Sequence, residues 1–258
     1  MKKKAIIFDL DGTAIDSPEK RLPSQKLVDT IATLKDNYYF SSATGRGWAF
    51  GGHIIQALGL TDPCIISAGT QICDPVSGKI LWQKNIDPDA VHQVLEIFKQ
   101  NPKYKMNHND YTEEDYTNGG VYYPNDFPTS EDVYFIEQIF VPESIALKLY
   151  EQLQKIKGIT CILILSQKPE TRDLHIVNHQ ATKEYAVAEL LKMLTVNVKD
   201  TIGIGDGHND IHLFNAVHHK VAMGNAVSEL KNAADQIIDT IKNDGMATYL
   251  QTLKNVRG

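Results

Sequence analysis

Two aspartates stand one residue apart where an apolar run ends, in the string KAIIFDLDGTAID of residues 4–16. Residues two apart on a strand point the same way, so the Asp9 and Asp11 carboxylates are expected about 7 Å apart, and Gly12 lets the chain turn away behind them. Carboxylates this close repel each other unless one takes a proton or a cation lies among them. Mg2+ suits the second arrangement, because it takes one or two protein carboxylates and shares its other positions with water and phosphate. A pair of turn-forming aspartates is the alternative interpretation, but the whole string DLDGT directly after an apolar strand rarely arises by chance.

A second polar cluster, SATGR, occupies residues 42–46 after another apolar segment. Thr44 in this cluster has two compatible interpretations. It can cap the following helix, as threonine often does. Alternatively, its hydroxyl and the free backbone N–H groups at a helix start can hold an anion.

Lys183 stands in an unusual place for a lysine. It follows Thr182, a candidate N-cap, and therefore lies in the first turn of an expected helix. A cation there opposes the helix dipole by about 0.3–1 kcal/mol. Either this lysine is an ordinary solvated surface residue, or it holds an anion and neutralises a neighbouring carboxylate.

The string GIGDGHND at residues 203–210 combines glycines with acids. Asp206 follows an expected strand, where it can complete a metal site with Asp9. Asn209 and Asp210 enter the next helix, and an acid suits the start of a helix. An acidic loop of ordinary turn residues is the alternative.

Zinc-type metal sites are not indicated. His208 and His212 are spaced four residues apart, but no Glu follows His208 to act as a base and no third ligand is evident. The cysteines also lack metal-ligand spacing, and they are interpreted as reduced, buried thiols of a cytosolic protein: Cys64, Cys73 and Cys161.

Strand and helix patterns alternate around these clusters. Strands are expected over 4–9, 38–43, 64–67, 201–205, 220–223 and 236–239, and helices over 23–36, 47–58, 182–194, 209–217, 228–234 and 244–254. This order predicts an α/β fold with a parallel sheet and right-handed crossovers. Ligands bind beyond the carboxyl ends of such strands, so the polar clusters are expected to meet in one crevice.

The middle of the chain has a different pattern. Helices are expected over 87–100 and 141–156, and strands over 133–141, 159–166 and 173–178, with a tyrosine- and acid-rich stretch between. We therefore expect a smaller α+β domain of residues 83–179, inserted into a core made of residues 1–82 and 180–258.

Size and composition limit the possible functions. The chain has 258 residues, of which 42% are hydrophobic, enough for one large domain or two modest ones. Its formal net charge is −6, and no basic patch of the kind that binds nucleic acid is present. No apolar stretch approaches a membrane span, and the N-terminus lacks a signal-peptide pattern. These features predict a cytoplasmic protein without nucleic-acid or membrane partners.

The motifs taken in order resemble those of the haloacid dehalogenase superfamily. They are DLDGT, TGR, Lys183, GDGHND and the downstream VAMGNA. More closely they resemble the Cof-like subgroup of phosphatases, whose α/β cap is inserted after the second motif, and the resemblance covers essentially the whole chain. It implies a Rossmann-like three-layer core, a mobile cap, Mg2+ as cofactor, and hydrolysis of a small phosphorylated metabolite such as a sugar phosphate. The expected assembly is a monomer or a small homo-oligomer.

The resemblance also implies roles for individual residues. Asp9 corresponds to the nucleophile, which becomes an aspartyl-phosphate, and Asp11 to the general acid/base. The residues implied in phosphate binding are Thr44, Gly45, Lys183 and Asn209. The metal ligands are implied to be Asp9, the Asp11 backbone carbonyl and Asp206. The supporting residues are Gly12, Thr13, Asp210 and Arg46, and Arg46 is expected to face the cap. The chain departs from relatives at Ala68, where they often have Asn, and at His175 and Gln180, where they often have an acid and a glycine. These departures leave the identity of the substrate undetermined, but they do not affect the expected chemistry.

Other functions use the same residues. A phosphomutase needs the same aspartate and metal, and a non-catalytic phosphate or Mg2+ sensor can keep the same fold, although a pure binder needs no acid/base partner such as Asp11. Substrate choice is expected to lie in the cap. Its aromatic and acidic residues either line a pocket for a sugar or form a solvated loop and domain core: Tyr111, Tyr116, Tyr122, Tyr123, Glu113, Glu114 and Asp115.

Overall fold

The computed structural model describes residues 2–16, 22–109, 111, 113–128 and 132–255. The chain divides into two compact units, which we call the core unit (Met1–Trp82 with Thr182–Gly258) and the inserted unit (Gln83–Ala181). Residues 180 and 181, expected in the core, therefore belong to the inserted unit. Each unit has its own hydrophobic cluster of buried side chains.

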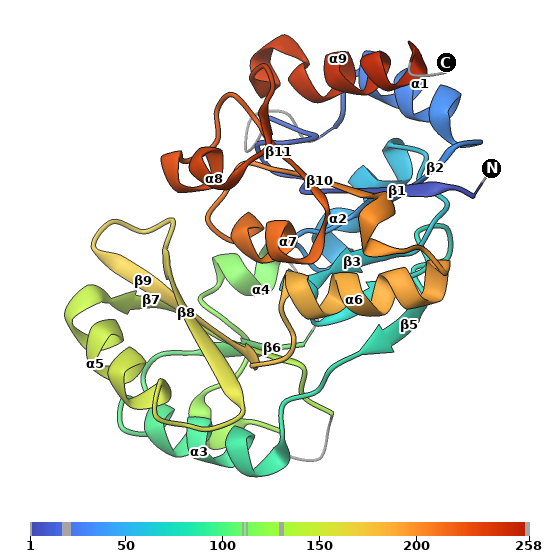
Figure 1. The fold of residues 1–258 in the computed structure, drawn as a ribbon. Coiled ribbons are helices and arrows are strands. Elements are labelled where there is room, and N and C mark those ends of the chain that lie inside the picture. The colour runs from blue at the N-terminus through green and yellow to red at the C-terminus, as the bar shows by residue number, and fades with distance from the viewer. Residues whose placement is uncertain (1, 17–21, 110, 112, 129–131, 256–258) are drawn as a thin grey trace. The chain divides into compact units, whose positions relative to one another are not determined.

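The core unit is built on a five-stranded parallel sheet, which confirms the α/β class (Figure 1). Its strands, in order across the sheet, are β12 (Gln236–Ile237), β11 (His219–Ala222), β10 (Thr201–Gly205), β1 (Lys4–Phe8) and β2 (Tyr38–Ser42). The four consecutive residues from Ala5 to Phe8 are fully buried. Such a continuous apolar run is typical of a parallel strand covered by helices on both faces.

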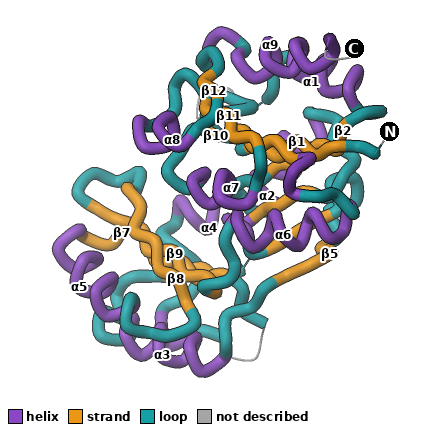
Figure 2. The backbone as a smooth tube through the Cα atoms, viewed as in Figure 1, coloured by secondary structure: helices purple, strands orange, loops and turns teal. Residues whose placement is uncertain are grey.

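Helices cover the two faces of this sheet. Helices α1 (Gln25–Leu34) and α9 (Gly245–Thr252) pack together on one face, and α6 (Lys183–Leu194) and α7 (Asp210–Ala216) pack together on the other (Figures 1 and 2). The remaining helices of the unit are α2 (Trp48–Ala57) and α8 (Ser228–Ala233). Helix α1 shows why these segments are helical: the Ser24 side chain accepts a hydrogen bond from the Leu27 N–H, and buried residues recur at helical spacing from Leu27 to Ile31 and Leu34.

The third expected strand does not join the parallel ladder. Strand β3 (Cys64–Ile66) forms a separate small sheet with β4 (Gln71–Cys73) and β5 (Ile80–Gln83), two strands that the pattern analysis missed. It meets the main sheet through one parallel bridge, between Ala43 and Ile65. The turn after β3 explains its pairing with β4, because Ser67, Ala68 and Gly69 have φ values of 50°, 58° and 101°. Positive φ in three consecutive residues reverses the chain at once, so β4 returns antiparallel to β3.

The inserted unit is an antiparallel sheet with an apolar helical layer against one face. The strand order is β6 (Met106–His108), β7 (Phe135–Pro142), β9 (Thr171–Asn178) and β8 (Ile159–Leu165). Helices α3 (Pro88–Phe98) and α5 (Glu143–Leu153) pack against it around a buried apolar cluster, and α4 (Glu113–Thr117) is short. Strand β6 and helix α4 were missed, because they lie in the tyrosine- and acid-rich stretch where no periodic pattern stands out.

Two expectations from composition can be compared with the structure. The three cysteines are buried and unpaired, as predicted. Among the residues that the structure describes, no helix combines the length and the apolar character needed to cross a lipid bilayer.

Candidate active site

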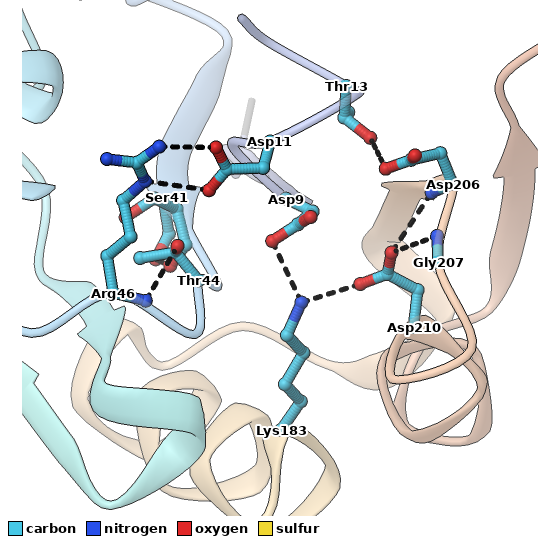
Figure 3. Close-up of polar contacts among 11 residues, drawn as sticks. Asp9, Asp11, Thr13, Ser41, Thr44, Arg46, Lys183, Asp206, Gly207 and Asp210 are labelled. Carbon is cyan, nitrogen blue, oxygen red and sulfur yellow. Dashed lines mark hydrogen bonds and ion pairs between the residues drawn. The ribbon is translucent and has the colours of Figure 1, made fainter. Parts of the chain in front are cut away.

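Acids from two strand ends and a lysine from a helix start meet in the core unit (Figure 3). The Lys183 ammonium donates hydrogen bonds to Asp9 Oδ1 at 2.9 Å and to Asp210 Oδ1 at 2.6 Å. The side chains of Lys183, Asp9 and Asp210 are 2%, 8% and 0% exposed. The interpretation of Lys183 as a solvated surface residue is therefore wrong.

Parallel pairing explains why these groups come together. Strands β1 and β10 are hydrogen-bonded neighbours in register from Ala5 with Thr201 to Phe8 with Ile204. The Asp9 N–H also donates to the Ile204 carbonyl at 3.0 Å. The acids that follow the two strands consequently emerge at the same edge of the sheet, as expected for this class of fold.

Charge in this cluster is unbalanced. Asp9, Asp206 and Asp210 supply three carboxylates and Lys183 one ammonium, so full ionisation leaves two negative charges in excess. Burial raises the pKa of Asp9 to about 8, although the Lys183 ammonium opposes the shift. Burial also raises the pKa of Asp206 to about 6, and its hydrogen bond from Thr13 opposes that shift. For Lys183, burial lowers the pKa, but the Asp210 and Asp9 carboxylates outweigh burial and the net pKa is raised, which keeps it an ammonium.

Asp206 is oriented by residues that follow β1 and β11. The Thr13 hydroxyl donates to Asp206 Oδ1 at 2.9 Å. The Asn225 amide donates to the Gly12 carbonyl at 2.8 Å and lies 3.5 Å from Asp206 Oδ2. Gly12 has φ +78°, and a Cβ there would lie 2.1 Å from Asp206 Oδ2, so glycine alone fits. Asn225 was not among the predicted site residues, although the string VAMGNA that contains it was noted.

Asp210 organises the loop that carries Asp206. Its Oδ2 accepts hydrogen bonds from the N–H groups of Asp206 and Gly207, both at 3.0 Å, while Oδ1 accepts from Lys183. It is the first residue of α7, where an acid interacts favourably with the helix dipole. The adjacent Asn209 is at the N-cap position, exposed, and makes no side-chain cap hydrogen bond.

Thr44 does not cap the next helix. The N-cap residue of α2 is Gly47, and the Thr44 hydroxyl oxygen instead accepts the Arg46 N–H at 3.1 Å. The N–H of Ala43 donates to the Phe8 carbonyl at 2.7 Å, which brings fully buried Thr44 beside the end of β1. Gly45, next to it, is exposed.

The Arg46 guanidinium binds the Asp11 carboxylate with two hydrogen bonds. Arg46 Nε donates to Asp11 Oδ2 at 2.7 Å, and Nη2 donates to Oδ1 at 2.5 Å. Both side chains are partly exposed, 27% for Arg46 and 34% for Asp11. Asp11 thus points toward the β2–α2 loop, whereas Asp9 points toward Lys183 (Figure 3).

The turn after β3 packs against the start of α6. A Cβ on Gly69 would lie 2.4 Å from the carbonyl carbon of Thr182 and 2.6 Å from the backbone nitrogen of Lys183. Thr182 is the N-cap residue, as expected, but its side chain makes no cap hydrogen bond. The position of Lys183 is therefore set by backbone packing against this turn and by its carboxylate partners.

The donor set fits a hard divalent cation. Asp9, Asp206 and Asp210 each offer an oxygen atom, and these atoms lie within 4.8 Å of one another. Asp210 already accepts three hydrogen bonds, which leaves Asp9 and Asp206 as the better ligands. One divalent cation would balance the excess charge, and all-oxygen ligation suits Mg2+. His208 and His212 are exposed, and each lies near a different glutamate.

The inserted unit carries a polar row that sequence reasoning missed. Asn107, Glu137 and His175 are cross-strand neighbours on β6, β7 and β9. Glu137 Oε2 accepts from the Asn107 amide at 3.2 Å, and Oε1 lies 2.5 Å from His175 Nε2. Burial alone would raise the pKa of Glu137, but the His175 contact and further hydrogen bonds outweigh it, and the net pKa is lowered. The sequence signal for Glu137 is an acid in the middle of the mostly apolar segment FIEQIF of an expected strand.

The aromatic cluster expected in this unit is divided. The Tyr116 hydroxyl donates to buried Asp173 at 2.9 Å. The Tyr122 ring packs edge-on against Phe127, within the apolar cluster of the unit. The Glu113 side chain lies outside what the structure describes.

Comparison with known proteins gives one consistent result. Residues 6–250 match the family model described as haloacid dehalogenase-like hydrolase. The chain is 24% identical over 266 residues to a putative phosphatase, YkrA, of Bacillus subtilis, and the match covers 98% of each chain. A solved haloacid dehalogenase-like hydrolase from Bacteroides thetaiotaomicron has a TM-score of 0.77 at 21% identity, with 98% and 100% of the two chains covered. A solved subclass IIB sugar phosphatase, BT4131, has a TM-score of 0.74 at 18% identity, with 98% and 99% covered.

Proposed function

Because this chain belongs to the haloacid dehalogenase-like hydrolases and is a phosphatase, we propose that it hydrolyses a small phosphate monoester through an aspartyl-phosphate on Asp9. One observation carries the proposal. A buried lysine holds Asp9 at 2.9 Å, beside a second acid that offers a metal ligand. A nucleophilic carboxylate, a cation and a metal-binding acid in one water-poor site are the components that phosphoryl transfer requires.

The proposed reaction has two steps. An Asp9 oxygen bonds to phosphorus while the ester P–O bond breaks, and the electron pair of that bond leaves with the alkoxide oxygen. Asp11 gives this oxygen a proton, so an alcohol departs. In the second step Asp11, now a carboxylate, takes a proton from water, whose oxygen attacks phosphorus, and the bond between Asp9 and phosphorus breaks to release inorganic phosphate.

Other residues of the core unit stabilise charge in this scheme. Lys183 and the Thr44 hydroxyl interact with the equatorial oxygens of the transferring group, together with backbone N–H groups of the adjoining loops such as that of Gly45. Mg2+ held by Asp9, Asp206 and the Asp11 backbone carbonyl would supply the positive charge that offsets repulsion between nucleophile and phosphate. Asp210 and Thr13 hold Asp206 and Lys183 in place.

We propose a sugar phosphate or a similarly small, polar ester as substrate. The inserted unit carries carboxylate, imidazole and amide groups on one sheet face, in Glu137, His175 and Asn107. Groups of this kind hydrogen-bond sugar hydroxyls, and His175 is the accessible member of the row, with its side chain 23% exposed while Asn107 and Glu137 are buried. One fold neighbour, BT4131, is itself described as a sugar phosphatase.

A phosphate-release screen tests the function. The protein is incubated with sugar phosphates, nucleotides, phosphoglycolate and pyridoxal phosphate, with Mg2+ and with a chelator. We expect Mg2+-dependent release from at least one ester, and its loss in Asp9→Asn with the fold retained by circular dichroism. Asp36→Asn, an exposed acid on the surface, is the control and keeps full activity. Full turnover in Asp9→Asn would refute the nucleophile assignment, a phosphorylated isomer as product would indicate a mutase, and no turnover of any ester would favour a sensor.

A further inference from the structure

The contact between Arg46 and Asp11 points to a specific role for an arginine that the family resemblance names only as a supporting residue. Resting on the proposed function, we infer that Arg46 is the positioning residue of the general acid/base: its guanidinium fixes the direction of the Asp11 carboxylate toward the leaving group. The two parallel N–H···O contacts, at 2.7 and 2.5 Å, fix both side-chain torsions of Asp11. A fork of this kind gives orientation as well as attraction.

Arg46 is itself held firmly, which a positioning residue requires. Its N–H donates to the Thr44 hydroxyl at 3.1 Å, and its carbonyl accepts the Ser67 N–H at 2.8 Å. Its Nη1 lies 3.4 Å from the Phe50 carbonyl, in the first turn of α2. The guanidinium therefore projects from a loop attached to two neighbouring segments, and the same loop carries a predicted phosphate ligand, Thr44.

Asp11 needs such support more than the other acids of the site. The side chains of Asp9 and Asp210 are nearly or fully buried and bound by Lys183, whereas Asp11 is 34% exposed on the loop after β1. A general acid has to lie within hydrogen-bond reach of the oxygen that it protonates. A partly exposed carboxylate without a fixed partner would sample several directions, and few of them would be productive.

The same geometry leaves acceptor sites on Asp11 for the proton that moves during turnover. Both Asp11 oxygens accept an N–H from Arg46 in this structure. Each carboxylate oxygen has two lone pairs, so one oxygen can exchange a proton with the leaving oxygen while it still accepts an N–H from Arg46. The two contacts with Arg46 keep the carboxylate in place meanwhile. A single-point cation such as lysine can supply one contact and not the pair.

Dependence on the leaving group separates this role from a structural one. A para-nitrophenolate leaves without help from an acid, whereas an alkoxide needs its proton. In Arg46→Ala we expect kcat/KM for an alkyl phosphate such as glycerol phosphate to fall about 10- to 100-fold, and for para-nitrophenyl phosphate less than about threefold. Guanidinium ion added to Arg46→Ala should restore part of the activity on the alkyl ester only, and Arg46→Lys should lie between the two.

A matched control is available in the inserted unit. Arg172 also binds one carboxylate, that of Glu143, through Nε and Nη2. Arg172→Ala removes a comparable ion pair far from Asp11 in the chain, so it should leave the ratio of kcat/KM for the two esters unchanged. Arg46→Gln, which keeps part of the stem and one neutral donor group, is the second variant, and thermal unfolding checks the fold of each protein.

Two outcomes would overturn the inference while leaving the phosphatase proposal intact. One is an equal loss on both esters, which indicates phosphate binding or a folding role for Arg46. The other is no loss on either ester. Failure of the proposed function has a different signature: the wild-type protein releases phosphate from neither ester, or Asp9→Asn remains active.

Discussion

Lys183 donates a 2.9 Å hydrogen bond to Asp9 across a sequence separation of 174 residues, and both side chains are buried. Each residue alone would be costly to bury as a charge, since an unpaired ion inside a protein loses its hydration. Together with Asp210 they form a site in which the neighbouring acids keep the lysine protonated. The stability of this arrangement and its function are therefore coupled.

Removing the ammonium should destabilise the core unit. Lys183→Met keeps the bulk of the stem but leaves Asp9 and Asp210 without their cation, and loss of one partner of a buried ion pair costs about 3–5 kcal/mol. Chemical denaturation measures this loss. Lys192→Met is the control, because Lys192 is an exposed residue of the same helix paired with Glu189, and such surface pairs contribute less than about 1 kcal/mol. Equal effects of the two substitutions would contradict this account.

Removing the nucleophilic carboxylate should stabilise the metal-free protein. Burial raises the pKa of Asp9 to about 8, so the folded chain resists its ionisation while the unfolded chain does not. Asp9→Asn removes that penalty, and we expect a gain of about 2 kcal/mol or more in the free energy of unfolding at neutral pH and above. The gain should vanish below about pH 3, where the acid is protonated in both the folded and the unfolded state. If Asp9→Asn instead lowers the free energy of unfolding at neutral pH, the ionised Asp9 carboxylate does not destabilise the folded protein.

Mg2+ should raise the melting temperature more at high pH than at low pH. The pKa values of Asp9 and Asp206 are raised to about 8 and about 6, above the unfolded value of about 3.9. The stability that these acids contribute is thus fully present below the unfolded pKa and is lost as the pH rises through the folded values. Mg2+ displaces protons from its ligands and relieves the same repulsion.

Thermal scans with saturating Mg2+ or with chelator test this between about pH 5.5 and about pH 8. For a chain of this size each 1 kcal/mol of stabilisation shifts the melting temperature by about 2–4 °C. Asp206→Asn should lose most of the Mg2+ effect. A Mg2+ shift that is larger at the acid end would argue against a carboxylate site.

A methyl group on Gly69 should displace the backbone that carries Lys183. Gly69→Ala combines a positive φ of +101° with a Cβ only 2.4 Å from the Thr182 carbonyl carbon. Gly158→Ala has a similar φ of +86° but nothing within 4 Å, so it reports the backbone cost alone, about 1–2 kcal/mol. Gly69→Ala should cost about 1–3 kcal/mol more and lower kcat/KM, while Gly158→Ala should not change kcat/KM. Unfolding curves and phosphate release measure the two effects, and indistinguishable variants would show that the turn does not position Lys183.

Local patterns were sufficient for most elements of the fold. Segments such as 4–9 and 182–194 carry strong periodic or apolar signals, and their predicted type agrees with β1 and α6. Signals of this kind failed for several short elements, although they found β3 and β12. Strands β4 and β6 contain three residues each, too few for any period to be visible, and their pairing depends on neighbours that are remote in sequence.

The acids and the lysine of the site were identifiable from their chain positions, because the carboxyl ends of parallel strands share one edge. Their partners were not identifiable in that way. That Thr44 receives the N–H of Arg46 instead of capping a helix, that Arg46 turns back onto Asp11, and that Asn225 reaches Gly12 all depend on where loops lie in space. A side chain's hydrogen-bond partner is decided by distances of a few ångströms between segments far apart in the chain, and neither residue type nor spacing encodes those distances locally.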